Sequence, residues 1–543
     1  MDFTPSLIQW ILAVIPIVAL IILMVSMRWT AQQAGTTGIF IASAVALFAF
    51  STPTDTLAVA SAKGVWDAIF ILYVIWPALL LYHVMSHSGG YDALRRGIQL
   101  LSRNELFIIV ALGWVFTSFL QGIDGFGTPI AVVAPLLVAF GMRPVYAVAI
   151  PIIAHIWAKF YGTLGVGWLA TLQVVDIDAA TTLSMALQSS VLMCIQALLG
   201  GLTLVWMYGR WAAVRSGWPL VLIIAAIQGI GQLLAIFVDP VLAAFLPATA
   251  ALVALYPLSR WSRYREADAS IKDRPAMLHA ASRPNSEAVP PMGLWTALAP
   301  YGLLTVLALC VSLIDPLHGL LDAAAFGLAF PEVTTGLGMT TAATAMYSPL
   351  RIFSHPGAYI LLTAVLTFVF FKRRGYFKKW AQQTGEEPVR IVSALVQGAV
   401  PASIPIIAFL VMASIMKHSG QNLTLAMGIA AVAPTYVFAF LANAIGILGA
   451  FMTSSSTSSQ VIFSDVQVQL AKAKGLPVST ILAAQNAGGA IGNAIAPANV
   501  VMGASTAGIA GQEGEILRKT LPWTIVVFIL TGVATVLLAL LMQ

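Results

Sequence analysis

The chain has 543 residues, of which 59% are hydrophobic and 9% are charged, and its formal net charge is +6. This composition excludes a soluble globular protein and predicts an all-α polytopic membrane protein with the lipid bilayer as its surroundings. The positive charge lies mainly in short loops, where it reports membrane orientation, so we expect no nucleic-acid partner. The two cysteines, Cys194 and Cys310, lie in apolar runs and indicate neither a metal site nor a disulfide.

The first half of the chain alternates apolar runs with short polar segments. We predict N-terminal scaffold helices in residues 1–60, a first repeat in residues 61–208 and further scaffold helices in residues 209–258. No basic segment precedes the first apolar run, so we expect a retained helix and not a cleaved signal peptide. Residues 259–292 are polar and basic, which predicts a cytoplasmic linker.

The second half follows the same plan. We predict scaffold helices and a second basic loop in residues 293–390, and a second repeat in residues 391–543. Residues 315–357 are too mixed in character for an element to be assigned. In total we expect about 12 to 14 transmembrane or re-entrant segments, with both basic loops in the cytoplasm and the N-terminus outside.

Two stretches interrupt the apolar runs, and the chain is organised around them. Residues 118–129 read SFLQGIDGFGTP, and residues 452–460 read MTSSSTSSQ. Glycine and proline break a helix, and the backbone groups that are freed at membrane depth must find partners in protein, ions or substrate. We therefore predict broken helices or hairpins at both places.

The two stretches belong to an internal repeat. MSHSG at residues 85–89 matches MKHSG at residues 416–420, and the same offset along the chain also pairs 121–129 with 452–460. Counting spans from the basic loops places the two histidines of these matches on opposite sides of the membrane, so the repeats are predicted to be inverted. Paired, interrupted segments point to a transporter's binding site. The alternative interpretation is a pair of structural hairpins with no site between them.

The residues in and around the breaks suit a small polar anion such as a carboxylate. Backbone N–H groups at the start of short helices attract anions, and the serine and threonine run adds hydroxyl donors. The alternative role for these hydroxyls is hydrogen bonding between helices. The candidate substrate contacts are Gly125, Gly127, Thr128, His155, Lys159, Ser455, Ser456, Thr457, Asn486 and Asn493.

Asp124 is the strongest single candidate for a functional residue, because a carboxylate at membrane depth costs free energy and is usually functional. We assign it, with Gln121, to the coupling ion, which is a proton or alternatively sodium. The competing interpretation is a structural ion pair with Lys159, which shares a helical face with His155.

The sequence argues against an enzyme. It contains no HExxH, no Walker loop, no dinucleotide fingerprint and no nucleophile–base pair, and it suggests no cofactor beyond the coupling ion. An anion channel remains a rival hypothesis, because it would share the broken polar helices but needs no titratable group. A homodimer is compatible with the sequence, which leaves the oligomeric state open.

Three motifs resemble those of the L-lactate permease family and occur in the same order. They are SFLQGIDGFGTPIAVVAPLLVAFGMRPVYA, GAFMTSSSTSSQVIF and AAQNAGGAIGNAIAPANVVMGASTAG. The resemblance implies a bacterial or archaeal inner-membrane symporter that takes up 2-hydroxymonocarboxylates, such as lactate and glycolate, with protons. It also implies an inverted-repeat fold in which a scaffold domain holds a moving transport domain with two re-entrant hairpins.

The chain departs from the family pattern where charges are placed. The family usually has a glutamate at the position of Gln121 and a small residue at that of Asp124, so the carboxylate has moved three positions along the chain. Asparagine is usual at the position of His155, an apolar residue at Lys159, lysine at Asn493 and aspartate at Ser456. This redistribution keeps a sulfonate or a dicarboxylate as an alternative substrate. We expect segments 105–174 and 436–510 to move against the remainder.

Overall fold

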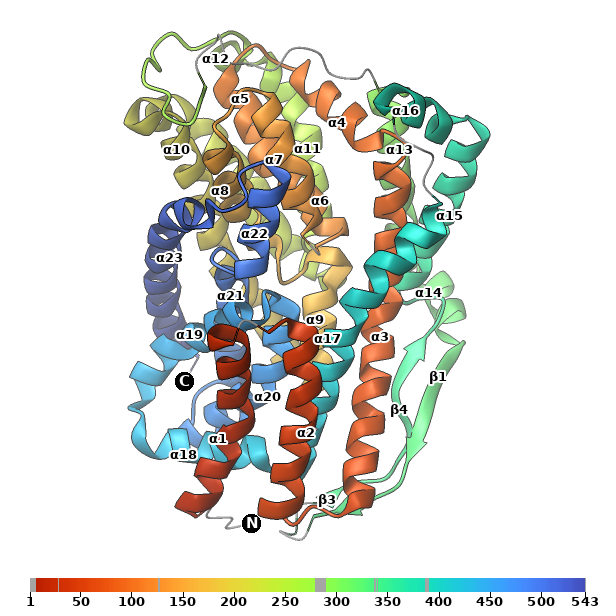
Figure 1. Cartoon of the computed structure of the whole chain (residues 1–543), viewed down its shortest axis with the longest axis vertical. Helices are drawn as coiled ribbons and strands as arrows, with labels where there is room; N and C mark the ends of the chain where they lie inside the picture. The colour runs from red at the N-terminus through yellow and green to blue at the C-terminus, as the bar shows by residue number, and fades with distance from the viewer. Residues whose placement is uncertain are drawn as a thin grey trace.

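The computed structural model describes residues 6–27, 29–125, 127–278, 290–335, 338, 340–385 and 390–542. Within these residues, eleven helices are long and apolar enough to cross a membrane, or up to twelve if a bent pair counts as one span. The bent pair joins Pro144–Ala158 to Gly162–Val174 at an angle of 54°. The predicted all-α polytopic membrane architecture is confirmed (Figure 1).

The first repeat begins with one long helix and continues through short, interrupted ones. Its elements are α3 (Thr54–Ser86), α4 (Gly90–Gln99), α5 (Glu105–Val110), the π-helical η2 (Ala111–Phe116), α6 (Thr117–Ile123), α7 (Thr128–Ala139), α8 (Pro144–Ala154), the short η3 (Ile156–Ala158), α9 (Gly162–Val174) and the first part of α10 (Ala179–Ile236).

The second repeat has the same order of elements. They are α17 (Ile391–Ser419), α18 (Gln421–Val432), α19 (Thr435–Thr453), α20 (Ser456–Lys474), α21 (Val478–Gly492), α22 (Pro497–Thr506) and α23 (Glu513–Leu541). The offset that carries residue 85 onto residue 416 also carries the start of α4 onto the start of α18, and the start of α5 to the position next to the start of α19. The repeat read from short sequence matches is therefore a repeat of structure.

The two repeats are inverted with respect to each other. The helices α3 and α17 pack against each other and run in opposite directions, so that α4 and α18 lie at opposite ends of the molecule (Figure 1). Gly64 marks the crossing, because a Cβ atom there would lie 2.6 Å from the Cα of Val411. Backbones approach this closely only where a side chain is absent.

The remaining helices surround the repeats. They are α1 (Leu7–Ile21) with its π-helical continuation η1 (Ile22–Ser26), α2 (Ala31–Ala49), η4 (Pro240–Leu242), α11 (Phe245–Arg260), α12 (Ser262–Arg265), α13 (Leu294–Leu313), α14 (Asp315–Asp322), α15 (Pro356–Arg373) and α16 (Tyr376–Thr384). The long helix α10 is broken at Gly209 and Arg210, where φ is −150° and 54°.

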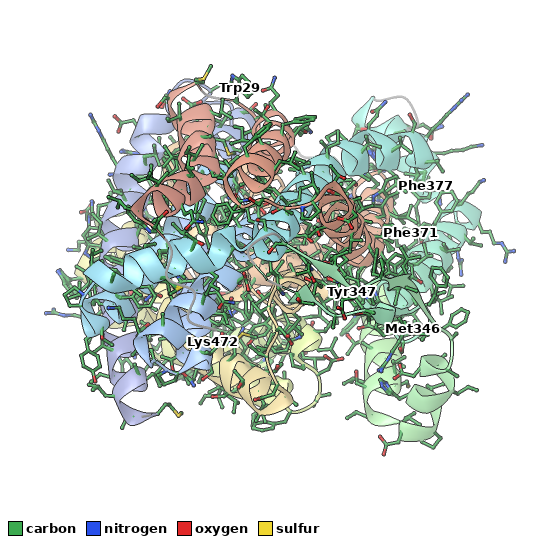
Figure 2. All side chains as sticks on the ribbon, turned by 90° about the horizontal axis from the view of Figure 1, so that it is seen from below. Trp29, Met346, Tyr347, Phe371, Phe377 and Lys472 are labelled. Atoms are coloured by element: carbon green, nitrogen blue, oxygen red, sulfur yellow. The ribbon has the colours of Figure 1, made fainter. Side chains whose placement is uncertain are left out.

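The segment 315–357, left unassigned from sequence, contains α14 and a β-hairpin. Strand β1 (Ala325–Phe330) pairs antiparallel with β4 (Thr344–Arg351), and β2 (Val333–Thr334) pairs with β3 (Thr340–Thr341). Successive β4 residues face opposite ways: Met346 is exposed, whereas Tyr347 donates a 3.0 Å hydrogen bond to Asp67 of α3 (Figure 2). Register shifts interrupt the β1–β4 pairing, so the alternation that identifies a strand in sequence is weak here.

The basic linker contacts the ends of helices in the first repeat. Arg143, at the start of α8, donates its backbone N–H to the carbonyl of Ala276 over 2.8 Å, and Arg274 pairs with Glu105 of α5 over 2.6 Å. The start of α5, the start of α8 and the linker therefore share one side of the membrane. By the excess of Lys and Arg, we expect this side to be cytoplasmic. The part of the linker at residues 279–289 lies outside the described residues.

This arrangement predicts the sidedness of two exposed lysines. In a background carrying Cys194→Ser and Cys310→Ser, Lys272→Cys in the linker should react with a membrane-impermeant maleimide only in inside-out vesicles. Lys472→Cys, near the end of α20 and seen from below in Figure 2, should react only in intact cells. Labelling of both cysteines from one side would contradict the inverted arrangement.

Candidate functional site

Two helical hairpins bring the interrupted stretches together. In the first, α6 ends at Ile123 and α7 begins at Thr128 after Gly127, whose φ of 91° is left-handed. In the second, α19 ends at Thr453 and α20 begins at Ser456, with Ser454 left-handed at φ 53°. Because the repeats are inverted, the hairpins enter from opposite sides. Their tips meet within the protein, where irregular backbone at membrane depth is tolerated.

A second pair of breaks faces the hairpin tips. Within α9, Thr163, Leu164 and Gly165 all have positive φ, at 53°, 49° and 78°. In the other half, the chain leaves α21 after Gly492 and restarts as α22 at Pro497. The repeat offset pairs Gly162 with Asn493, so these breaks correspond as the hairpins do.

The breaks enclose a cavity of about 250 Å³. Its walls come from both repeats, and they are mostly small or polar. The lining residues are Gln121, Gly125, Gly127, Lys159, Gly162, Thr163, Val166, Thr453, Ser454, Ser455, Ser456, Thr457, Asn493, Ala498, Asn499 and Met502. Of the residues predicted from sequence, the structure thus gathers Gln121, both hairpin glycines, Lys159, the three Ser455–Thr457 residues and Asn493.

Hydrogen bonds between the segments hold the cavity walls in place. Thr163 accepts a 2.7 Å hydrogen bond from the backbone N–H of Gly125, which ties the first hairpin tip to the break in α9. Ser454 accepts one of 3.1 Å from the N–H of Ala498, which ties the second tip to α22. Ser455 caps α20 by accepting from the N–H of Ser458 at 3.2 Å. These bonds satisfy some of the backbone donors that the breaks release.

Three helix N-termini and one lysine lie at the cavity wall. The helices α7, α20 and α22 begin at its wall, so the positive ends of their dipoles point at it. Lys159 lines the cavity and is only 6% exposed. Its ammonium donates no hydrogen bond to another residue in the described part of the chain. Helix N-termini, a lysine and neutral donors are groups that can bind an anion.

Glycines let the wall pack tightly around Gln121. A Cβ atom on Gly125 or on Gly162 would lie 2.5 Å from the amide nitrogen of Gln121. Its amide oxygen is buried and has no hydrogen-bond partner among the described residues. Gln121 is therefore packed closely against backbone on two sides.

Asp124 lies just behind the cavity and not in its lining. It is 2% exposed and accepts a 2.7 Å hydrogen bond from the hydroxyl of Thr128, at the start of α7. The opposite charge of Lys159 is close enough to attract it. Asp124 and Thr128 are thus placed to sense the charge in the cavity without touching its contents.

Two predicted contacts lie away from the cavity. His155 hydrogen-bonds through Nδ1 to the carbonyl of Pro151 in α8, and Asn486 donates to the hydroxyl of Ser189 in α10 over 3.1 Å. Ser459 has the alternative role predicted for these hydroxyls, which is hydrogen bonding between helices. It lies in α20 and donates to the carbonyl of Gly446 in α19. A sequence can show which residues share one face of a helix, but it does not show which other helix that face contacts.

Several lining residues were not singled out as contacts from sequence. Thr453 directly precedes the serine and threonine run, and Thr163 lies in the break of α9. Asn499, in α22, donates to the side chain of Asn493 over 2.8 Å. The repeat offset could have found Gly162, since it pairs this residue with Asn493. Nothing in the sequence around Met502 indicates that it lines the cavity.

The fold and the site define a multi-pass membrane transport protein, in which interrupted inverted repeats enclose a central polar cavity. The chain belongs to the L-lactate permease family, because the model of that family matches residues 9–542.

Known proteins resemble the chain over nearly its full length. It is 27% identical to the L-lactate permease of Salmonella typhi, over 97% of this chain and 95% of that protein. It is 25% identical to the glycolate permease GlcA of Escherichia coli, strain K12, with the same coverage of 97% and 95%. Among solved structures, the YdaH transporter of Alcanivorax borkumensis matches with a TM-score of 0.39 and 15% identity, over 86% of this chain and 84% of that one.

The bond between Thr163 and Gly125 gives a test of how the cavity is held. Thr163→Val keeps the side-chain shape but leaves a buried N–H without an acceptor, at a cost of about 1–3 kcal/mol. We expect a lower unfolding temperature for the purified protein in detergent. The control is Thr171→Val on the same helix, where the hydroxyl only donates back to Gly167 of its own helix. Equal unfolding temperatures for the two variants would show that the bond does not support the site.

Proposed function

We propose that the chain takes up a small organic anion, a 2-hydroxymonocarboxylate of the lactate and glycolate type, and binds it in the cavity between the hairpin tips. The observation that carries this proposal is the buried Lys159 in a cavity of about 250 Å³ at which several helices begin. The relatives named L-lactate permease and glycolate permease support the choice of substrate class.

The cavity lining divides into parts that suit the two ends of such a substrate. Lys159 and the backbone N–H groups at the hairpin tips would hold the carboxylate. The hydroxyls of Ser456 and Thr457 and the amides of Asn493 and Asn499 would bind the 2-hydroxyl group, which both donates and accepts. The substrate leaves chemically unchanged, since transport requires binding and release only.

Transport would proceed by alternating access, with residues 105–174 and 436–510 moving as a unit against the scaffold. Polar contacts across this boundary would have to open in each cycle. One is the 2.9 Å hydrogen bond from Lys417, in α17, to the carbonyl of Val174 at the end of α9. Another joins Ser348 of the β-hairpin to Gln173 over 2.7 Å. The inverted repeats would give the two end states similar energies.

Asp124 would couple uptake to an ion gradient. Because it is buried beside Lys159 and bonded to Thr128, adding a substrate anion to the cavity raises the negative charge around it. A proton on Asp124 would offset that charge, so anion and proton would bind and leave together. A sodium ion is the alternative coupling ion. The protein would reside in the inner membrane of a bacterium or an archaeon.

Removing the charge of Lys159 should weaken substrate binding. A charge-assisted hydrogen bond is worth about 1.5–3 kcal/mol, so Lys159→Gln should raise KM for lactate about tenfold to a hundredfold. The measurement is uptake of labelled lactate into proteoliposomes under an imposed pH gradient. The matched control is Lys378→Gln on the exposed face of α16, which should leave KM unchanged. An unaltered KM for Lys159→Gln would remove this residue from the site.

The same assay can identify the substrate class. Glycolate should compete with labelled lactate, whereas a dicarboxylate should compete at least about tenfold less well, since one cation in a small cavity balances one carboxylate. A sulfonate also carries one charge, but its tetrahedral head group is bulkier than a planar carboxylate, so it too should compete less well than glycolate. Stronger competition by a dicarboxylate or a sulfonate would show that the proposed substrate class is wrong, without contradicting the proposed binding site.

Asp124→Asn tests coupling separately from binding. The amide oxygen can still accept from Thr128, but the carboxylate charge is lost. We expect counterflow exchange of lactate to persist, while accumulation driven by a pH gradient falls to equilibrium. Accumulation at the level of the unaltered protein would exclude Asp124 as the coupling group. Absence of accumulation in the unaltered protein under both pH and sodium gradients would favour an anion channel.

A further inference from the structure

A second cavity lies apart from the central one, in a crevice between α8, α10 and α23. It has a volume of about 360 Å³. These three helices are in contact with one another, although α23 comes from the end of the chain and α8 from its first half (Figure 1). The crevice shares no lining residue with the central cavity. It is therefore a separate cavity from the central one.

One end of the crevice is cationic. Arg210, Arg518 and Lys519 line it, and no acidic residue does so among the described residues. Arg518 pairs with Glu515 over 3.1 Å and is largely exposed. Arg210 and Lys519 are half-buried, and in the described chain neither forms an ion pair with a carboxylate. Half-buried cations without a carboxylate leave the crevice with a net positive charge that an anion can balance.

Aromatic rings hold these cations in place. The guanidinium of Arg210 lies 4.2 Å from the centre of the Trp206 ring, and the ammonium of Lys519 lies 5.0 Å from that of Tyr146. Arg210 adopts φ 54°, which is unfavourable for a residue other than glycine. The kink in α10 thus positions a cation at the mouth of the crevice at some cost in backbone energy.

The other end of the crevice is apolar. On α10, Leu199, Thr203 and Trp206 lie on one helical face before the break at Arg210, so this part of the lining extends about 10 Å along the axis. On α23, which runs in the opposite direction, Lys519 is followed by Pro522 and Val526. Both helices therefore place cations at the same end and apolar side chains deeper in the membrane.

The crevice is open toward lipid on the side we expect to be cytoplasmic. Tyr208, next to the cationic end, donates to Glu105, which also binds Arg274 of the basic linker. Trp206 and Val526 remain 40% and 51% exposed, so the crevice wall reaches the lipid-facing surface. Positive charge at this depth, with apolar surface below it, matches the head group and chains of a phospholipid.

We propose that this crevice binds an anionic phospholipid. Its phosphate lies between Arg210 and Lys519, and an acyl chain follows Leu199, Thr203 and Val526 toward the membrane interior. The charge complementarity and the apolar lining below it select this occupant over a free anion, which would gain nothing from the deeper part of the crevice.

The test uses the purified full chain, stripped of lipid and titrated with phosphatidylglycerol or phosphatidylcholine, with bound lipid counted by native mass spectrometry. We expect one tightly held phosphatidylglycerol, bound at least about tenfold more tightly than phosphatidylcholine. The double variant Arg210→Gln, Lys519→Gln should lose this preference, since each cation near the surface adds to the attraction. The control double variant Arg373→Gln, Lys378→Gln removes the same amount of charge on the same side of the membrane. This control should keep the preference for phosphatidylglycerol.

A second variant and a second probe distinguish the occupants. Thr203→Phe narrows the apolar part of the crevice and leaves the cations unchanged. It should therefore weaken the binding of phosphatidylglycerol and leave the binding of glycerol phosphate unchanged. Equal binding of both lipids to the unaltered protein would overturn the proposal. So would an unchanged preference in the Arg210, Lys519 variant, or full displacement of the lipid by inorganic phosphate or lactate, which would indicate a general anion site.

Discussion

The need to satisfy every backbone polar group at membrane depth governs this structure. A helix that stops inside the bilayer releases N–H and C=O groups that lipid cannot bind. Here the interrupted segments satisfy one another across elements. The N–H of Gly125 finds Thr163, and that of Ala498 finds Ser454. Each bond joins a hairpin tip to a broken helix, so the segments must converge on one place. Their convergence forms the central cavity.

The inverted repeat supplies the geometry, while divergence between its halves supplies the chemistry. The first half contributes charge, with Lys159 in the cavity wall and Asp124 behind it. The second half contributes neutral donors such as Ser456 and Asn493. Both charged residues thus lie in one half, where Lys159 and Asp124 attract each other. An exact repeat would have placed two cations or two carboxylates in the same small space, at a high electrostatic cost.

Much of the site could be predicted because helix breaks are encoded locally. Glycine and proline in one half, and a serine run in the other, interrupt apolar segments wherever they occur. The repeat offset then relates the breaks to each other and points to the stretches that carry Lys159 and Asn493. Asn486 illustrates the limit of this reasoning. It precedes Asn493 on the same stretch by about two helical turns, but its amide meets Ser189 of α10. The β-hairpin was missed because shifts in its register weaken the alternation of its strands.

The sequence by itself determined that this protein lies in a membrane, where its helices break, and that its halves are inverted. Composition, helix-breaking residues and the placement of Lys and Arg are local or additive properties, so they can be read without knowing any contact. The tertiary structure decided which side chains line the cavity and which only pack helices together. It also decided that Arg210 and Lys519, which are far apart in the chain, face one crevice. Such neighbours depend on the rotation and crossing of packed helices, which no single segment encodes.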